Sequence, residues 1–213
     1  MTAGFYANEM LHGAVITLEL TAGAFAVSLT AAAVLALVRV HGPKVLRAVV
    51  LGYVELVRGL PAILQLFVIY FGLAQFGFDL SAFTAAFVWM CFYGTGYAIE
   101  IFRAGIEAVP AGQTEAGTAL GLGSIALNTR IVVPQAVAVM LPPLVNFLIL
   151  ELKSTTIVYI VGLHDIMFQA RLGAANSGQP LTIYLIAAGF YIVMNVALGR
   201  VGALFERRMG WAR

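Results

Sequence analysis

Long apolar runs, separated by short polar segments, extend along this chain of 213 residues. An apolar α-helix rises about 1.5 Å per residue and needs roughly 20 residues to cross the hydrocarbon core of a bilayer. Charge-free runs of that size predict five membrane-spanning helices, at residues 20–38, 59–78, 80–99, 131–150 and 172–199. The pattern therefore predicts an all-α integral membrane protein. Because no internal repeat, low-complexity tract or linker divides the chain, we interpret residues 1–213 as one domain.

The composition indicates the same class. Hydrophobic residues make up 62% of the chain and charged residues only 10%, and the mean hydropathy is +0.96. These values lie far outside the range of soluble globular domains. The single cysteine, Cys91, has no partner for an intramolecular disulfide. The histidines are not spaced as metal ligands, so the sequence predicts no metal site and no cofactor in this chain.

Lysine and arginine are distributed unevenly about the predicted spans. Of the 12 Lys and Arg residues, only Lys153 and Arg171 fall on one side. The positive-inside rule places the other, basic side in the cytoplasm. We therefore predict that the N-terminus lies outside and that the C-terminus, with its basic tail, is cytoplasmic. No basic segment precedes the first apolar run, so a cleaved signal peptide is not expected.

The segment 115–136 lies between the third and fourth predicted spans, on the predicted cytoplasmic side, and is rich in small residues. A helix containing Ala116, Gly117, Gly121 and Gly123 would have a nearly bare backbone on one side. Small residues of this kind allow another surface to approach closely. We therefore expect residues 115–123 to form a short cytoplasmic helix that docks on another protein.

The order of residues in this segment resembles the EAA loop in the membrane subunits of bacterial ABC importers. That pattern reads Glu-Ala-Ala, three residues, Gly, nine residues, Ile, one residue, Leu-Pro. Here Gly117 stands in place of the second Ala and Val133 in place of Leu. The resemblance implies a type I ABC importer fold in which this loop is the coupling helix that contacts the ATPase. The implied coupling residues are Glu115, Ala116, Gly117, Leu120, Gly121, Ile131 and Pro134.

Elsewhere the resemblance narrows to permeases of the polar amino acid family, which carry histidine, glutamine, arginine or opines. The segment YVELVRGLPAILQLFVIYFGL is similar to a pattern of that branch, with Leu60 in place of Thr. Residues 97–113 and the segment LELKSTT match the branch as well, with Ser154 where Asp is frequent. The resemblance covers nearly the whole chain. It implies transport of a polar amino acid or opine by alternating access.

Polar and helix-breaking residues within or next to the predicted spans are candidates for the substrate path. Glu55 and Arg58 lie three residues apart and can pair, either to anchor the depth of the helix or as part of a gate. Pro142 and Pro143 are expected to interrupt the fourth span, so Asn146 either lines a cavity or bonds a freed carbonyl. The complete set is Glu55, Arg58, Pro61, Tyr97, Glu100, Asn146, Glu151, Lys153, Ser154 and Thr155.

Glu151 and Lys153 indicate the chemistry of the substrate. A pair of opposite charges at membrane depth suits a zwitterionic substrate better than a neutral sugar. Lys153 resembles the lysine that stands close to the bound amino acid in this branch, and an α-carboxylate is its natural partner. Glu151 stands where the branch ordinarily has an apolar residue, and it favours a substrate with a cationic side chain. The alternative is a salt bridge between Glu151 and Lys153.

The chain lacks a phosphate-binding loop, because no glycine-rich run ends in Gly-Lys-Ser or Gly-Lys-Thr. ATP and Mg are therefore expected to bind to a separate ABC ATPase dimer, and this chain is not expected to be an enzyme. Five helices do not enclose a polar path by themselves, so a second permease subunit, identical or homologous, should complete it. The resemblance also implies a periplasmic substrate-binding protein and a location in the bacterial inner membrane. No nucleic-acid partner is expected.

Three other classes of membrane protein fit the sequence less well. An ion-coupled secondary amino acid transporter would have inverted repeats and acidic residues at helix centres, and neither is visible. An intramembrane enzyme would need a Ser/His or Asp/Asp pair at a common depth. A structural subunit without transport would have no need for the interruption expected in the fourth span.

Overall fold

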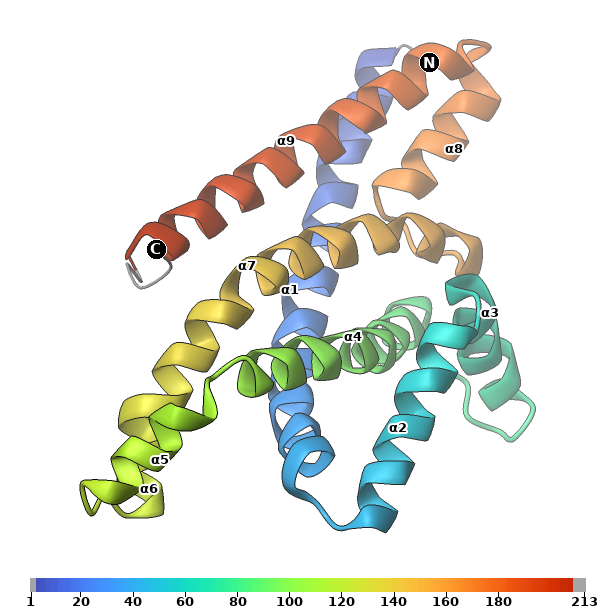
Figure 1. Cartoon of the computed structure of the whole chain (residues 1–213). Coiled ribbons are helices and arrows are strands. Elements are labelled where there is room, and N and C mark those ends of the chain that lie inside the picture. The colour runs from blue at the N-terminus through green and yellow to red at the C-terminus, as the bar shows by residue number, and fades with distance from the viewer. Residues whose placement is uncertain (1–2, 209–213) are drawn as a thin grey trace.

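The computed structural model describes residues 3–208, and every regular element in that range is helical (Figure 1). The chain begins with α1 (Ala3–His41), α2 (Lys44–Gly59), α3 (Ala62–Phe67) and the π-helical turn η1 (Val68–Gly72). After α4 (Ala82–Glu107) come two short helices, α5 (Ala111–Ala119) and α6 (Ser124–Leu127). The remainder consists of the π-helical turn η2 (Asn128–Val132), α7 (Val133–Ser154), the 3₁₀ helix η3 (Thr155–Val161), α8 (Ile166–Ser177) and α9 (Pro180–Arg208).

Four stretches of the described chain are long and apolar enough to cross a membrane. They are α1, α4, the nearly continuous helix from residue 124 to residue 161, and α9. When the bent pair of α2 and α3–η1 is counted as one span, the described chain has five candidate spans. The predicted all-α membrane class is therefore confirmed, and the predicted five spans require the bent pair. The orientation of the two ends relative to the membrane stays a prediction.

Pro61 determines the shape of the second predicted span. Helix α2 and the α3–η1 helix meet there at an angle of 108°. Proline has no N–H group and excludes helical angles at the preceding residue, so Leu60 has extended values of φ −100° and ψ 141°. The second predicted span, residues 59–78, therefore forms a crossing only as part of the bent pair with α2. Helix in that region begins only at Ala62, after the bend.

The fourth predicted span is not interrupted at its two prolines. Pro142 and Pro143 lie inside α7, which runs without a break from Val133 to Ser154. Each proline removes one backbone hydrogen bond but has a φ that suits a helix, and the turns on either side keep their own bonds. The expected interruption is therefore wrong. The irregular turn lies earlier, at η2 just before Pro134, where a wider turn gives the proline ring room.

The fifth predicted span, residues 172–199, is divided at Gly178. This glycine has φ +66° and ends α8, and Pro180 begins α9. Glycine just past a helix end and proline at the start of the next helix are strong stop and start signals. Only α9 therefore forms the last apolar span. Helix α8 packs instead beside α1 (Figure 1).

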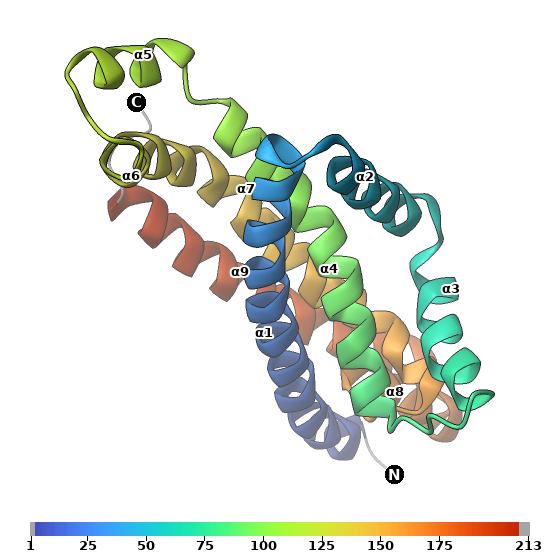
Figure 2. The same ribbon diagram turned by 90° about the horizontal axis from the view of Figure 1, so that it is seen from below.

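Close packing between α1 and α4 forms the centre of the molecule (Figure 2). The inward face of α1 carries small residues, among them Ala24, Ala32 and Ala36, which are fully buried. Trp89 and Met90 of α4 pack in the same core as Ala24 and have no exposed surface. Small residues let two helix backbones approach closely, and membrane helices depend on this packing because lipid offers no hydrophobic drive for association.

The junction between η3 and α8 contains a buried acid outside the apolar spans. Asp165 is fully buried, and its Oδ1 atom caps α8 by accepting a hydrogen bond from the Phe168 N–H at 2.9 Å. Its Oδ2 atom has no hydrogen-bond partner within the described residues. Gly13 of α1 packs against this junction, where a Cβ would lie 2.6 Å from the Asp165 carbonyl carbon. Burial raises the pKa of Asp165 to about 6.

This raised pKa predicts a pH-dependent contribution of Asp165 to stability. An aspartate in an unfolded chain has a pKa of about 3.9, so folding favours the protonated form. The stabilising contribution is therefore fully present below about pH 4 and is lost as the pH rises through about 6. The Asp165→Asn substitution keeps the capping oxygen and removes the ionisation. The free energy of unfolding of the variant minus that of wild type should therefore be larger at pH 8 than at pH 4, by on the order of 2 kcal/mol.

Thermal unfolding of both proteins in detergent, at pH 4 and at pH 8, measures this difference. The comparison at each pH cancels the titration of all other groups. An equal stability difference between variant and wild type at the two pH values would contradict the assignment.

Candidate functional site

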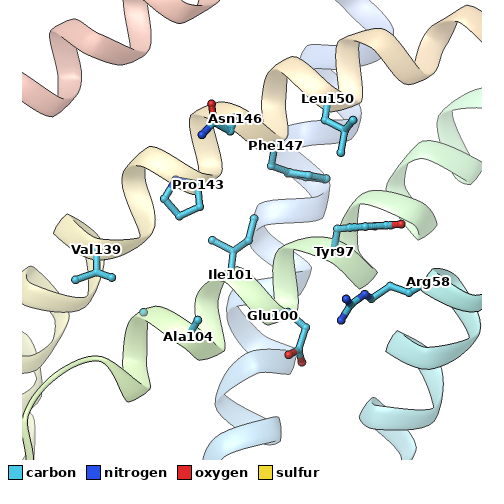
Figure 3. A pocket seen from close by; sticks show the side chains of 11 residues that line it. Arg58, Tyr97, Glu100, Ile101, Ala104, Val139, Pro143, Asn146, Phe147 and Leu150 are labelled. Carbon is cyan, nitrogen blue, oxygen red and sulfur yellow. The ribbon is translucent and has the colours of Figure 1, made fainter.

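A pocket of about 470 Å³ lies between α2, α4 and α7. Most of its wall is apolar, and four side chains bring polar atoms to it, from all three helices (Figure 3). An apolar cleft with a few well-placed polar groups is the usual form of a small-molecule site. The lining residues are Arg58, Tyr97, Glu100, Ile101, Ala104, Gly105, Val139, Pro143, Asn146, Phe147 and Leu150.

The four polar residues of the pocket, Arg58, Tyr97, Glu100 and Asn146, are all residues that the sequence proposes for the substrate path. Two other proposed residues on or next to α2 do not line it. Pro61 forms the bend beyond Arg58, and the side chain of Glu55 is exposed. No ion pair joins Glu55 to Arg58 in the described chain, so that expected pair is wrong. The guanidinium group of Arg58 extends instead toward Glu100, as Figure 3 shows.

Glu100 is oriented by an arginine of its own helix. Arg103 donates hydrogen bonds to Glu100 Oε2 from Nε at 3.0 Å and from Nη2 at 2.7 Å, and a third to Glu107 from Nη1. The other oxygen, Glu100 Oε1, is buried and has no hydrogen-bond partner within residues 3–208. Glu100 is therefore fixed in orientation and keeps one acceptor atom unused beside the pocket.

Glu151 is a charged residue in the core between the helices. Its side chain is completely buried, and neither carboxylate oxygen has a hydrogen-bond partner in the described part of the chain. It points into the contact of α7 with α1 and α4. A Cβ placed on Gly94 of α4 would lie 2.6 Å from Glu151 Oε1 and would also overlap the hydroxyl oxygen of Ser28 on α1. A buried carboxylate without hydrogen-bond partners is costly, so this residue is a strong candidate for a functional role.

The residues after Glu151 face in other directions. Lys153 is exposed. The Ser154 hydroxyl donates to the Leu150 carbonyl at 3.0 Å, and the buried Thr155 hydroxyl donates to the Leu152 carbonyl at 2.7 Å. Residues two apart on a helix do not share a face, so Glu151 and Lys153 form no ion pair. The alternative of a mutual salt bridge is therefore wrong, and the structure does not bring these residues into the pocket.

Helices α5 and α6 form a hairpin that projects at one end of the molecule (Figures 1 and 2). Helix α5 begins at Ala111 and ends at Ala119, four residues earlier at both ends than the predicted helix over residues 115–123. Pro110 precedes the first turn, where a fixed φ favours helix initiation. Gly121 has φ +76°, so the helix cannot continue through it. The predicted short helix therefore exists with corrected bounds.

Two glycines give this hairpin its shape. The N–H of Gly121 bonds to the Thr118 carbonyl at 2.9 Å, and the N–H of Leu122 bonds to the Gly117 carbonyl at 3.1 Å. This pair of bonds is the Schellman motif that closes a helix. Gly117 is buried, and a Cβ there would overlap the side chain of Leu127 and lie 3.3 Å from Ile131 Cδ1. Gly117 therefore faces the second arm of the hairpin and not the outside.

The outer surface of the hairpin is exposed and partly apolar. The side chains of Leu120 and Ile125 are 81% and 83% exposed, and Glu115, Ala116 and Pro134 are exposed as well. Large apolar side chains gathered on a surface are typical of a protein–protein contact. Beside α6 lies a hollow of about 600 Å³ that is lined by Gly123, Ser124, Ile125, Ala126, Thr129 and Arg130.

The sequence analysis did not include Ile125, Thr129 or Arg130 among the coupling residues. The signal that indicates them is the four-residue spacing of Ile125 and Thr129, which places both side chains on one face of a helix. The EAA pattern leaves these positions unspecified, so the resemblance alone did not identify them.

The sequence of this chain resembles those of known transport proteins. Residues 20–211 match the family described as binding-protein-dependent transport system inner membrane component. The chain is 34% identical to the arginine transport system permease protein ArtQ of Bacillus subtilis (strain 168), over 94% of this chain and 92% of that protein. It is 32% identical to the probable glutamine ABC transporter permease protein GlnM of the same organism, over 96% and 93%. It is 29% identical to the octopine transport system permease protein OccQ of Rhizobium radiobacter, over 94% and 90%.

Solved structures show the same fold. A chain in the crystal structure of an amino acid ABC transporter with histidines is 35% identical and superposes with a TM-score of 0.88, over 95% of both chains. A chain of the MetNI methionine ABC transporter, in an inward-facing form, is 18% identical and has a TM-score of 0.75, over 94% of this chain and 95% of that one. The second likeness extends to the fold alone.

Proposed function

Because this chain belongs to the family of binding-protein-dependent transport system inner membrane components, it is a transport subunit and not an enzyme, and we propose that its substrate is a polar amino acid or opine with a cationic side chain. Permeases for arginine, glutamine and octopine are among its relatives. The observation that supports a cationic substrate is Glu151, a fully buried carboxylate without a partner in the described chain. No relative supports the ion-coupled alternative.

A guanidinium or ammonium group on the substrate would supply the hydrogen-bond donors and the positive charge that Glu151 lacks within the described chain. Such a group donates two or more hydrogen bonds and carries the opposite charge, and charge-assisted bonds of this kind are about twice as strong as neutral ones. Lys153 is exposed on another face of α7, so it meets the α-carboxylate of a substrate only before the substrate reaches Glu151. Both residues therefore have a place on the proposed path, but at different points along it.

The pocket between α2, α4 and α7 is proposed as the continuation of the path toward the cytoplasm. Three polar groups line this pocket: the cation of Arg58, the anion of Glu100 and the amide of Asn146. The cation suits the carboxylate of an amino acid, and the anion suits its ammonium group. A single chain leaves apolar residues of α2 and α3 exposed, for example Leu56 and Ile63. We propose that a second permease subunit, identical or homologous, covers them and completes the path.

The α5–α6 hairpin is proposed as the coupling element on an ABC ATPase dimer, which would bind ATP and Mg. The exposed side chains of Leu120 and Ile125 support this role, and so does the position of Glu115 on the outer surface of α5. A periplasmic binding protein would deliver the substrate to the opposite side. In this arrangement the protein lies in the bacterial inner membrane with its N-terminus outside and its C-terminus in the cytoplasm.

Reconstitution with its ATPase and its binding protein tests the proposal. Proteoliposomes that contain the complete complex should take up arginine or a related cationic amino acid only when ATP and loaded binding protein are both present. Native mass spectrometry of the purified complex should find two permease chains for each pair of ATPase chains. One permease chain per ATPase pair would rule out the two-subunit path, and uptake without ATP would rule out an ATP-driven importer.

A further inference from the structure

Glu151 and the larger part of the pocket lie on opposite sides of one level in the helix bundle. On α7, Glu151 follows Phe147 by one turn, and both side chains are buried. Of the pocket-lining residues on this helix, Val139 and Pro143 precede Phe147, and only Leu150 follows it. On the antiparallel helix α4, Gly94 beside Glu151 precedes Tyr97 by about one turn, and Glu100 follows it. The level that contains Tyr97 and Phe147 therefore lies between the Glu151 carboxylate and the part of the pocket that is lined by Val139, Pro143 and Glu100.

Aromatic rings occupy this level. The rings of Tyr97 and Phe147 are stacked, with centroids 6.3 Å apart and planes 13° from parallel. Phe25 of α1 lies 6.1 Å from Phe147, and Tyr93 lies 4.7 Å from Tyr97. Figure 3 shows the rings of Phe147, from α7, and Tyr97, from α4, edge-on and nearly parallel in the space between the two helices. We call these four residues the aromatic layer.

Carboxylate oxygens without a hydrogen-bond partner among residues 3–208 lie on both sides of the aromatic layer. Glu151 offers two oxygens on one side. On the other side, Glu100 offers Oε1, with its carboxylate oriented by Arg103. A cationic group that leaves Glu151 would thus pass ring faces, which attract cations, before it meets the second carboxylate. The stacked rings of Tyr97 and Phe147 lie between these two carboxylates along the bundle.

From this geometry we propose that Tyr97 and Phe147 form the inner gate of the transport path, which opens when α4 and α7 separate and the stacked rings part. The proposal rests on the proposed function, since it assumes that substrate moves between Glu151 and the pocket. A stacked ring pair is suited to this role because two aromatic rings make a largely apolar barrier, in which the Tyr97 hydroxyl is the only polar group of the two side chains. Small shifts of two helices are enough to unstack the rings.

Leakage through the assembled complex in proteoliposomes tests the gate. The vesicles are preloaded with radiolabelled arginine, and efflux is measured without ATP and without binding protein. The Phe147→Ala and Tyr97→Ala variants should each raise this efflux by about tenfold or more over wild type, because removal of one ring opens the barrier. Tyr97→Ala is an independent test if the Phe147 variant does not fold.

Phe83→Ala is the matched control. Phe83 is also on α4 and stacks on another ring, that of Phe87 at 6.4 Å, but it is 39% exposed and distant from the pocket lining. Its efflux should equal that of wild type. Wild-type efflux in both gate variants, or equal leakage in the Phe83 control, would overturn the gate. Failure of the wild-type complex to transport arginine would instead overturn the proposed function, so the two failures are distinguishable.

Discussion

The Glu151→Gln substitution is expected to reduce uptake of cationic amino acids by about 100-fold or more, because removing one charge of a buried ion pair costs roughly 3–5 kcal/mol. The fold should persist, since the carboxylate makes no hydrogen bond within the described chain and glutamine has nearly the same shape. Uptake of neutral amino acids should fall much less. The measurement is the initial rate of uptake of radiolabelled arginine and of radiolabelled glutamine, in proteoliposomes supplied with loaded binding protein. The ratio of the arginine rate to the glutamine rate shows whether the loss is selective.

Gly94→Ala provides an independent test of the same site. A Cβ at this position would lie 2.6 Å from Glu151 Oε1, so it should displace the carboxylate and cause the same selective loss. Gly189→Ala on α9 is the matched control, because a Cβ there meets nothing within 4 Å. Lys153→Met should slow the uptake of all amino acids alike, because it removes a contact with the α-carboxylate. If Glu151→Gln and Gly94→Ala both left the ratio of arginine uptake to glutamine uptake unchanged, a contact between Glu151 and the cationic side chain of the substrate would be refuted.

The Gly121→Trp substitution is expected to uncouple ATP hydrolysis from transport. Gly121 has φ +76°, a conformation that costs an L-residue roughly 1–2 kcal/mol, and a Cβ there meets nothing within 4 Å. The indole ring would therefore project from the hairpin into the surface proposed to contact the ATPase. Uptake should fall to background while the ATPase activity of the complex loses its response to loaded binding protein. Parallel assays of ATP hydrolysis and uptake measure the two effects.

Gly77→Trp is the control for backbone strain. Gly77 also has a positive φ of +84° and open space around it, but it lies in the turn between η1 and α4, away from the hairpin. The Gly77→Trp variant should carry a backbone strain similar to that of Gly121→Trp, but its ATP hydrolysis should stay coupled to transport. Ile125→Asp places a charge on a side chain that is 83% exposed and leaves the backbone unchanged, so it should reproduce the loss of coupling. Normal transport by both Gly121→Trp and Ile125→Asp would exclude the hairpin from coupling.

Features with local causes could be predicted from the sequence. The apolar runs indicate spans because each helix satisfies its own backbone groups in lipid, whatever its neighbours. The EAA-like order of Glu115, Gly121 and Pro134 located the α5–α6 hairpin, although the predicted bounds of α5 were displaced by four residues. That error arose from weight given to the small residues at 117–123, when Pro110 and Gly121 mark the start and the end of the helix.

The shapes of the second and fourth spans depended on more than local signals. Pro61 produces a bend of 108°, whereas Pro142 and Pro143 leave α7 continuous. The same residue type therefore has opposite outcomes. A proline only removes one hydrogen bond and restricts one neighbour, and packing of the flanking turns decides whether the helix continues. The sequence analysis expected the interruption at Pro142 and Pro143, where the helix is continuous, and was wrong there.

The sequence by itself determined the membrane class, the approximate spans and the polar residues available to a substrate, because apolar length and residue chemistry are properties of the chain. Only the tertiary structure decided how those residues are grouped. It brings Arg58, Glu100 and Asn146 to one pocket, buries Glu151 and leaves Lys153 exposed. The physical reason is that the environment of a side chain depends on which face of its helix another helix covers. Contacts between residues far apart in the chain set that choice, as when Gly94 and Ser28 enclose Glu151.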